Sequence, residues 1–400
     1  MLQPELNKKI VLTLLILTTT LMTMSTDLFA PSLPYLPEYF STTDQMVKLT
    51  MSLWMMAYGG LLLIYGPLSE RFGRRPILVA AMTMFTLASF LCTLATSIEQ
   101  LLLARVLQGA AAGAEGVLVL SIVRDCFDEK GQVWAFSLYR GVCALPPIFA
   151  PILGAYVFLV FGWQANFLLL AVIAAIVTTL LWFLLDESHC EKKSRLSFRL
   201  IVKDYGRLLI NTRFLGFTLI MATSIAYLVV FPTVVPFVLV DQLGHEADVF
   251  GYFQGAVMIA FVLGAACSNR LSHHMEIHKL LLLGIVIVCC GAVLLLLVAF
   301  MQVESLVTLG LPLAVIAFGN GPVMSTAPPL AMGSASCATG ASAAMMLTIT
   351  SALASLTAVI EGAISTGTSL SLAMILCAVA GVALLAYCGV YLFRSKAELS

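Results

Sequence analysis

The sequence predicts an all-α membrane protein with twelve transmembrane helices in two six-helix bundles, and three observations support this. Hydrophobic residues make up 60% of the chain and charged residues only 10%, against about 25% charged in ordinary soluble domains. Apolar stretches of about 20 residues, the length that crosses a bilayer core, recur along the whole chain. Only one long basic segment, 186–213, interrupts this rhythm.

Hydropathy places the predicted spans at regular intervals. They run 10–31, 49–68, 76–96, 99–122, 131–157, 164–185, 214–240, 249–269, 279–300, 304–327, 339–361 and 369–393. The shortest breaks between spans fall at 97–98 and 301–303. Because six spans precede the basic segment and six follow it, we expect an N-terminal bundle at 1–185, a cytoplasmic linker at 186–213 and a C-terminal bundle at 214–400.

The distribution of positive charge predicts the orientation. If the N-terminus is cytoplasmic, 18 of the 21 Lys and Arg residues fall in inside segments. The outside loops carry only Lys48, while Arg105 and Arg140 lie within spans. The positive-inside rule therefore predicts a multi-pass protein of the bacterial inner membrane with both termini in the cytoplasm.

Several other functions lack their sequence signals. The ten cysteines lie in spans or inside loops, so we expect no disulfide framework. No C-x-x-C or His/Cys cluster suggests a metal site, and no phosphate loop or nucleophile–base arrangement suggests an enzyme. We therefore expect no cofactor, no metal and no catalytic residue, and no nucleic-acid partner.

The inside loop between the second and third spans carries the most specific short motif, GPLSERFGRRP at 66–76. Its glycines permit a tight turn, and its charged residues can pair with charges at neighbouring inner helix ends and so latch one conformation. The residues expected to form this latch are Gly66, Ser69, Glu70, Arg71, Gly73, Arg74 and Asp125. A basic loop that only obeys the topology rule would explain the arginines but not the spacing of the motif.

This loop resembles the signature loop of the major facilitator superfamily, with Glu70 where most members carry aspartate. Two further runs narrow the resemblance to the Bcr/CflA-like drug:proton antiporters. The fourth span contains Arg105-x-x-Gln108-Gly109, and the first ends in an Asp-x-x-x-Pro-x-x-Pro run that begins at Asp27. The resemblance implies the twelve-helix fold and the export of small molecules by proton exchange.

The fifth span is similar to the antiporter motif whose Gly and Pro bend that helix, through the run APILG at 150–154. The residues that correspond to the motif are Gly141, Pro147, Pro151 and Gly154. The chain also departs from the family: Leu145-Pro146-Pro147 replaces a glycine-rich approach, and Glu115 and Arg140 stand where small or apolar residues are expected. These departures concern the substrate class rather than the fold.

Ionisable residues inside spans are expensive and indicate function. Asp27 lies 17 residues from the inner start of its span and Arg105 lies 17 from the inner end of its own, so they share a level. Glu115 and Arg140 share a second, deeper level on either side of the inner loop near 127. The alternative is that both pairs are salt bridges that only hold helices together, although buried pairs contribute little net stability.

We expect Asp27 to carry the exchanged proton and Arg105 to bias its charge. Glu115 and Arg140 are expected to bind polar groups of the substrate, and Trp54, Tyr58 and Tyr139 to line an aromatic cavity. Glu361, at the outer end of the eleventh span, is expected to snorkel to the interface.

These expectations combine into a proton-coupled exporter of drug-like or amphiphilic compounds, active as a monomer, with protons, a small-molecule substrate and the lipid bilayer as its partners. One alternative keeps the fold but exports a polar metabolite such as a siderophore or amino acid, which the mid-membrane charges favour. Another is a transporter-like membrane protein that senses a ligand without transporting it.

Overall fold

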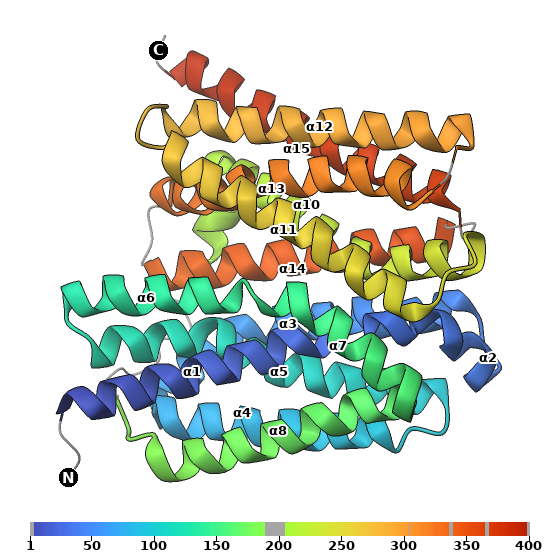
Figure 1. Cartoon of the computed structure of the whole chain (residues 1–400). Helices are drawn as coiled ribbons and strands as arrows, with labels where there is room; N and C mark the ends of the chain where they lie inside the picture. The colour runs from blue at the N-terminus through green and yellow to red at the C-terminus, as the bar shows by residue number, and fades with distance from the viewer. Residues whose placement is uncertain (1–3, 189–204, 304, 336–338, 365–367, 398–400) are drawn as a thin grey trace. The chain divides into compact units, whose positions relative to one another are not determined.

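The computed structural model describes residues 4–188, 205–303, 305–335, 339–364 and 368–397, and every regular element in these ranges is helical (Figure 1). Helices satisfy their own backbone hydrogen bonds, which the apolar interior of a bilayer requires. Twelve stretches of the described residues are long and apolar enough to cross a membrane, so the predicted number of spans is confirmed.

Contact clustering divides the chain into unit 1, Met1–Phe198, and unit 2, Arg199–Ser400. Unit 1 contains α1 (Pro4–Asp27), the 3₁₀ helix η1 (Ala30–Tyr35), α2 (Leu36–Phe40), α3 (Asp44–Phe72), α4 (Arg74–Thr93), α5 (Ile98–Cys126), α6 (Glu129–Cys143), α7 (Pro146–Phe161) and α8 (Trp163–Leu184). Unit 2 contains α10 (Thr212–Phe237), the π-helical turn η2 (Val238–Gln242), α11 (Ala247–Leu271), α12 (Ile277–Met301), α13 (Leu306–Gly333), α14 (Thr339–Ile364) and α15 (Ser369–Ala397). The predicted limits of the bundles and of the linker stay a prediction, since 189–204 lies outside the described residues.

The two units repeat the same helix pairings. In unit 1, α3 and α4 pack on α5, α4 also packs on α8, and α1 packs on α7 and α8. In unit 2, α11 and α12 pack on α13, α12 also packs on α15, and α10 packs on α14 and α15. The helix order therefore relates α1 to α10, α3 to α11, α4 to α12, α5 to α13, α7 to α14 and α8 to α15.

Prolines interrupt two of the predicted spans. The first helix ends at Asp27, four residues before Pro31, and the chain continues as a short 3₁₀ helix that contains Pro34. The fifth predicted span, 131–157, is wrong as a single helix: α6 ends at Cys143 and α7 begins at Pro146. Proline has no backbone N–H to donate to the preceding turn, and its ring clashes with the carbonyl four residues earlier, so the pair Pro146-Pro147 accounts for the break.

Glycines allow the closest helix approaches in both units. A Cβ atom on Gly109 of α5 would collide with the backbone carbonyl of Trp54 on α3. A Cβ on Gly264 of α11 would collide in the same way with the carbonyl of Phe318 on α13. Small residues at such crossings are the usual means of packing helices within a membrane, where apolar lipid supplies no drive for helix association.

Candidate functional site

A buried carboxylate in unit 1 joins three helices. Glu115 lies near the middle of α5 and is 8% exposed. Its Oε1 atom accepts hydrogen bonds from the Thr19 hydroxyl of α1 at 2.9 Å and from the Tyr139 hydroxyl of α6 at 2.8 Å. The two hydroxyl oxygens lie 3.2 Å apart, and Thr19 has one proton, so it can donate to the carboxylate or to Tyr139 at any moment. The cluster can therefore rearrange its hydrogen bonds when the charge of Glu115 changes.

An aromatic pair lies beside this cluster. Trp54 and Tyr58 of α3 stack with their ring centroids 5.6 Å apart and an interplanar angle of 10°. Among the described residues, the buried indole Nε1–H of Trp54 has no hydrogen-bond acceptor. A buried donor without a partner is costly, and a ligand that accepts from it would remove that cost.

Arg105 on α5 is fully buried and its guanidinium is surrounded by acceptors and rings. It donates to the backbone carbonyls of Ser25 on α1 and Thr50 on α3, at 3.2 and 3.4 Å, and to Oε1 of Gln108 at 2.5 Å. The rings of Phe29, Trp54 and Phe167 lie 5.4–5.8 Å from the guanidinium carbon, within the range of cation–π attraction. Arg105 thus ties α5 to α1 and α3.

Asp27 is the last residue of α1 and is 7% exposed. Its burial fits an ionisable residue inside the membrane, but its predicted part in proton exchange, and that of Arg105, stay predictions. Arg140 follows Tyr139 in α6, and its side chain lies outside the described residues, so its predicted role is likewise open.

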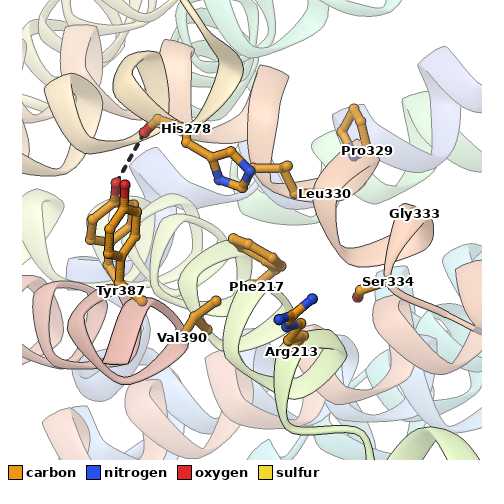
Figure 2. A pocket seen from close by; sticks show the side chains of 10 residues that line it. Arg213, Phe217, His278, Pro329, Leu330, Gly333, Ser334, Tyr387 and Val390 are labelled. Carbon is orange, nitrogen blue, oxygen red and sulfur yellow. Dashed lines mark hydrogen bonds between the residues drawn. The ribbon is translucent and has the colours of Figure 1, made fainter. Parts of the chain in front are cut away.

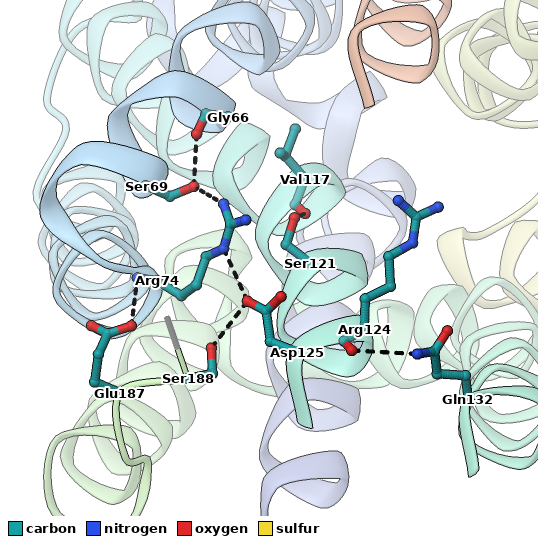
Figure 3. Close-up of polar contacts among 10 residues, drawn as sticks. All are labelled: Gly66, Ser69, Arg74, Val117, Ser121, Arg124, Asp125, Gln132, Glu187 and Ser188. Atoms are coloured by element: carbon teal, nitrogen blue, oxygen red, sulfur yellow. Dashed lines mark hydrogen bonds and ion pairs between the residues drawn. The ribbon is translucent and has the colours of Figure 1, made fainter. Parts of the chain in front are cut away.

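The loop 66–76 builds a set of polar contacts where α3 ends and α4 begins (Figure 3). Arg74 is the first residue of α4, and its Nε lies 3.2 Å from Oδ2 of Asp125 at the end of α5. Its Nη1 donates to the Ser69 hydroxyl at 2.5 Å, and Ser69 in turn donates to the Gly66 carbonyl at 2.8 Å. The predicted latch residues Gly66, Ser69, Arg74 and Asp125 are therefore brought together.

Gly73 makes the turn that begins α4. Its φ angle is +100°, which residues with a Cβ rarely adopt, and a Cβ there would collide with the Glu187 carboxylate. Oε1 of Glu187 accepts from the backbone N–H of Arg74 at 2.9 Å, so it caps the N-terminus of α4. Glu70 and Arg71 are exposed, and Arg71 lies over the ring of Phe72 at 5.2 Å.

The residues of the antiporter motif lie in different surroundings. Gly154 of α7 packs on the backbone of Leu28, where a Cβ would collide with a carbonyl, and its own carbonyl accepts from Asn166 of α8 at 3.1 Å. Pro151 is buried, Pro147 is partly buried and Gly141 is exposed. Gly154 therefore brings α7 against the chain directly after Asp27.

Sequence reasoning was wrong about Glu361 and missed several partners. Glu361 on α14 is completely buried instead of snorkelling to the interface. Thr19 and Glu187 were not predicted, the first because a threonine in a span carries no charge signal, the second because it was assigned to the linker. Arg75, which donates to the carbonyl of Trp182 on α8 and lies over its ring, was predicted only as a topology signal.

Comparison with known proteins identifies the fold. The family model described as Major Facilitator Superfamily matches residues 15–358. The structure of a D-xylose–proton symporter aligns over 96% of this chain and 97% of its own, with a TM-score of 0.78 and 14% identity.

Among curated proteins, the chloramphenicol resistance protein CraA of Acinetobacter baumannii is 26% identical over 330 residues, which are 81% of this chain and 79% of that protein. The multidrug resistance protein MdtL of Klebsiella pneumoniae is 25% identical and covers 75% of this chain and 76% of its own. The multidrug transporter MdfA of Yersinia pestis is 28% identical, with coverages of 65% and 64%.

Proposed function

This chain belongs to the major facilitator superfamily, and from that premise we propose that it is a proton-coupled antiporter that exports drug-like molecules across the bacterial inner membrane. The observation that carries the proposal is that unit 1 buries two carboxylates, Asp27 and Glu115, and that the second lies near the aromatic pair of Trp54 and Tyr58. Relatives named for chloramphenicol and multidrug resistance support the same substrate class. The relatives and the family make the chain a transporter rather than an enzyme.

The exchange requires one carboxyl group that alternates between two charge states. When substrate arrives from the cytoplasm, Asp27 releases its proton to that side; when substrate leaves on the other side, Asp27 takes up a proton there. Burial favours the neutral acid, whereas a nearby cation favours the carboxylate, and this competition allows a small change of surroundings to move the proton. Two observations support Asp27 in this role: its side chain is buried, and Gly154 of the antiporter motif packs on the chain directly after it.

Glu115 and the aromatic pair are proposed to bind the substrate. The stacked rings of Trp54 and Tyr58 offer a flat apolar surface, and the unpaired Nε1–H of Trp54 offers a donor. Thr19, Tyr139 and Glu115 supply hydroxyl and carboxylate groups for polar parts of the substrate, with Arg140 as a further predicted contact.

The test is transport of chloramphenicol into inside-out vesicles driven by a pH gradient, with the wild type and the variants Asp27→Asn and Asp44→Asn. Asp44 is an exposed aspartate of the same unit and serves as the matched control. We expect gradient-driven uptake by the wild type and by Asp44→Asn and its loss in Asp27→Asn, with substrate binding retained. Undiminished transport by Asp27→Asn would refute the assignment of the proton, and uptake by the wild type that ignores the gradient would refute antiport.

A second candidate function has its own supporting observation. The three-residue cluster around Glu115 is more polar than a lipophilic drug requires, which favours export of a polar metabolite such as an amino acid. Competition decides between the two: unlabelled amino acids should reduce uptake only if the polar metabolite is the substrate, whereas lipophilic drugs should compete if the first proposal holds.

The proposal includes cytoplasmic termini, a monomeric protein, and a latch between Arg74 and Asp125 that closes the inner end of unit 1 in one conformation. The positive-inside distribution of Lys and Arg supports the orientation. Labelling of a cysteine introduced at the C-terminus, accessible in inside-out vesicles but not in intact cells, tests it.

A further inference from the structure

A pocket of about 440 Å³ opens within unit 2, where the first residues of α10 and α12 meet the last turns of α13 and α15 (Figure 2). Each of the four helices contributes to its wall: Arg213 and Phe217 from α10, His278 from α12, Leu330 from α13 and Tyr387 from α15. These helix ends lie on the side that the distribution of Lys and Arg assigns to the cytoplasm. All the residues that line the pocket belong to unit 2.

One side of the pocket is positively charged. The Arg213 guanidinium has no hydrogen-bond or ion-pair partner among the described residues, and Figure 2 shows it reaching toward Ser334. The imidazole of His278, which is able to carry a second positive charge, lies 6.0 Å from the ring of Phe217. None of the described residues that line the pocket is acidic. Among the described residues the pocket therefore presents the Arg213 guanidinium without a protein anion to pair with it.

Hydrogen bonds between helices hold the walls in place. Nδ2 of Asn211 donates to the Ser334 carbonyl at 2.8 Å, which joins the start of α10 to the end of α13. Oδ1 of the same Asn211 accepts from the backbone N–H groups of Arg213 and Phe214 and so caps α10. The Tyr387 hydroxyl donates to the His278 carbonyl at 3.3 Å, which joins α15 to α12.

The other side of the pocket is apolar and aromatic. Phe217 and Tyr387 are buried in its wall, and the exposed ring of Tyr391 stacks on Tyr387 with 5.8 Å between centroids. Positive charge beside apolar surface at the cytoplasmic end of transmembrane helices is the composition that binds anionic lipid headgroups. A small hydrophilic anion would leave the apolar half of such a pocket without contacts.

We infer that this pocket binds the phosphate group of an anionic phospholipid of the inner leaflet. Arg213 binds the phosphate oxygens through charge-assisted hydrogen bonds, Ser334 and His278 lie within the same polar wall, and Leu330 and Tyr391 contact the glycerol and the first carbons of the acyl chains. A free phosphate or a phosphate ester shares the headgroup chemistry but lacks the apolar part.

The experiment counts lipid molecules retained by the detergent-purified full-length protein in native mass spectrometry, after addition of phosphatidylglycerol or of phosphatidylcholine. The variants are Arg213→Gln and Arg270→Gln. Arg270 is an exposed arginine at the end of α11 on the same side of unit 2, outside the pocket, so it controls for loss of one positive charge. We expect retained phosphatidylglycerol on the wild type and on Arg270→Gln, and about tenfold weaker retention on Arg213→Gln, because a charged hydrogen-bond partner is lost.

Three results would overturn the inference. Equal retention by Arg213→Gln and the wild type would exclude the pocket, and an equal loss in Arg270→Gln would reduce the effect to general charge. Displacement of phosphatidylglycerol by an equal concentration of glycerol 3-phosphate or inorganic phosphate would assign the pocket to a soluble phosphate instead of a lipid. Because Arg213 is exposed, its variant is expected to elute from size-exclusion chromatography as the wild type does, which confirms that the fold is intact.

Discussion

In unit 1 the Glu115 carboxylate of α5 accepts a hydrogen bond from Thr19 of α1, and in unit 2 the Asn320 side chain of α13 accepts one from Ser224 of α10, at 2.7 Å. Helix order and helix pairing make these elements correspond, and both acceptors are buried. The same junction therefore carries an ionisable group in one unit and a neutral amide in the other. An amide holds the helices together at every pH, whereas a carboxylate can also change its charge.

The helix ends at which α4 and α12 begin differ in a related way. In unit 1, Arg74 at the start of α4 fills the space between helices and lies against Asp125 (Figure 3). In unit 2, the start of the corresponding α12 borders a pocket, and Arg213 has no acidic residue to pair with among the described residues (Figure 2). Arg74 of unit 1 therefore has an ion-pair partner, and so does Lys279 at the start of α12, whereas Arg213 of unit 2 has none among the described residues.

The comparison teaches that helix pairing and site chemistry vary independently in this fold. Both units pack the same pairs of helices through glycine contacts, so the scaffold constrains small residues but not the polar groups between them. The proposed proton and substrate residues all lie in unit 1. The predictions below test this division, beginning with the scaffold that the units share.

The largest expected effect comes from the glycine crossings. In Gly109→Ala and in Gly264→Ala the new Cβ meets a backbone carbonyl of the neighbouring helix, so α3–α5 or α11–α13 must separate. We expect either variant to lower the free energy of unfolding by about 3 kcal/mol, seen as lost monodisperse protein in fluorescence-detected size-exclusion chromatography. Gly60→Ala and Gly381→Ala are the controls, since nothing lies within 4 Å of the added Cβ at either position.

The four glycine variants test whether the two units share the same packing requirement. A wild-type yield for Gly264→Ala beside a lost Gly109→Ala would mean that the two units do not share their packing requirement. The helices of the two units would then correspond in their order along the chain but not in how closely they must pack.

A second prediction concerns the matched junctions. Glu115→Gln keeps the size of the side chain but removes the charge, and we expect it to reduce chloramphenicol transport about tenfold, because substrate contacts at a carboxylate are charge-assisted. Asn320→Ala should leave transport within about twofold of the wild type and lower stability by about 1 kcal/mol, the typical cost of one lost hydrogen bond. Initial rates in proteoliposomes at equal protein content measure the first effect, and thermal unfolding measures the second.

A transport loss in Asn320→Ala as large as that in Glu115→Gln would contradict the division of roles. It would show that Asn320 of unit 2 takes part in the transport cycle as directly as Glu115 of unit 1.

The fold was predictable from sequence because lipid leaves the backbone few choices. Apolar stretches of spanning length must be helices, and the charge distribution between them indicates their order across the membrane. The break at Pro146 was missed because hydropathy does not change there, although the proline pair itself was visible. The burial of Glu361 was missed because a position near a helix end does not show whether the side chain turns outward or toward other helices.

The sites were less predictable because counting residues gives the level of a side chain in the membrane but not the side of the helix from which it projects. Counting predicted that Glu115 and Arg140 share a level, and the α6 hydrogen bond that the structure shows for Glu115 comes from Tyr139, the residue before Arg140. Thr19 escaped notice because hydroxyl residues are common in membrane helices. The contact of Arg74 with Asp125 could be predicted because the charges of the loop were expected to pair with charges at neighbouring helix ends, and Asp125 lies at one such end. The Glu187 cap depends instead on how the chain leaves α8.

A third, smaller effect concerns the latch. We expect Arg74→Gln and Asp125→Asn each to slow transport about threefold without loss of protein, because the ion pair is partly exposed and worth about 1 kcal/mol. If the two act through their contact, the double variant should be no slower than either single variant. Additive losses would mean that each residue acts through other partners, and the contrast with the open pocket of unit 2 would lose its functional meaning.

The smallest expected effect is a loss of stability in a variant beside the pocket of unit 2. Tyr387→Phe removes only the hydroxyl that donates to the His278 carbonyl, at a distance of 3.3 Å. His278 lies in the first turn of α12, so its carbonyl also accepts the helical hydrogen bond from the backbone N–H four residues later. The carbonyl therefore keeps one partner in the variant, and the lost bond should cost no more than about 0.5 kcal/mol. Tyr227→Phe is the matched control, since its hydroxyl donates to the Leu313 carbonyl at 2.9 Å in a fully buried position and should cost about 1 kcal/mol. Thermal unfolding ranks the two, and native mass spectrometry should find phosphatidylglycerol retention unchanged in both. If Tyr387→Phe weakens lipid retention without lowering the unfolding temperature, then this hydroxyl contacts the headgroup, and the pocket uses α15 as well as Arg213 to bind the phosphate.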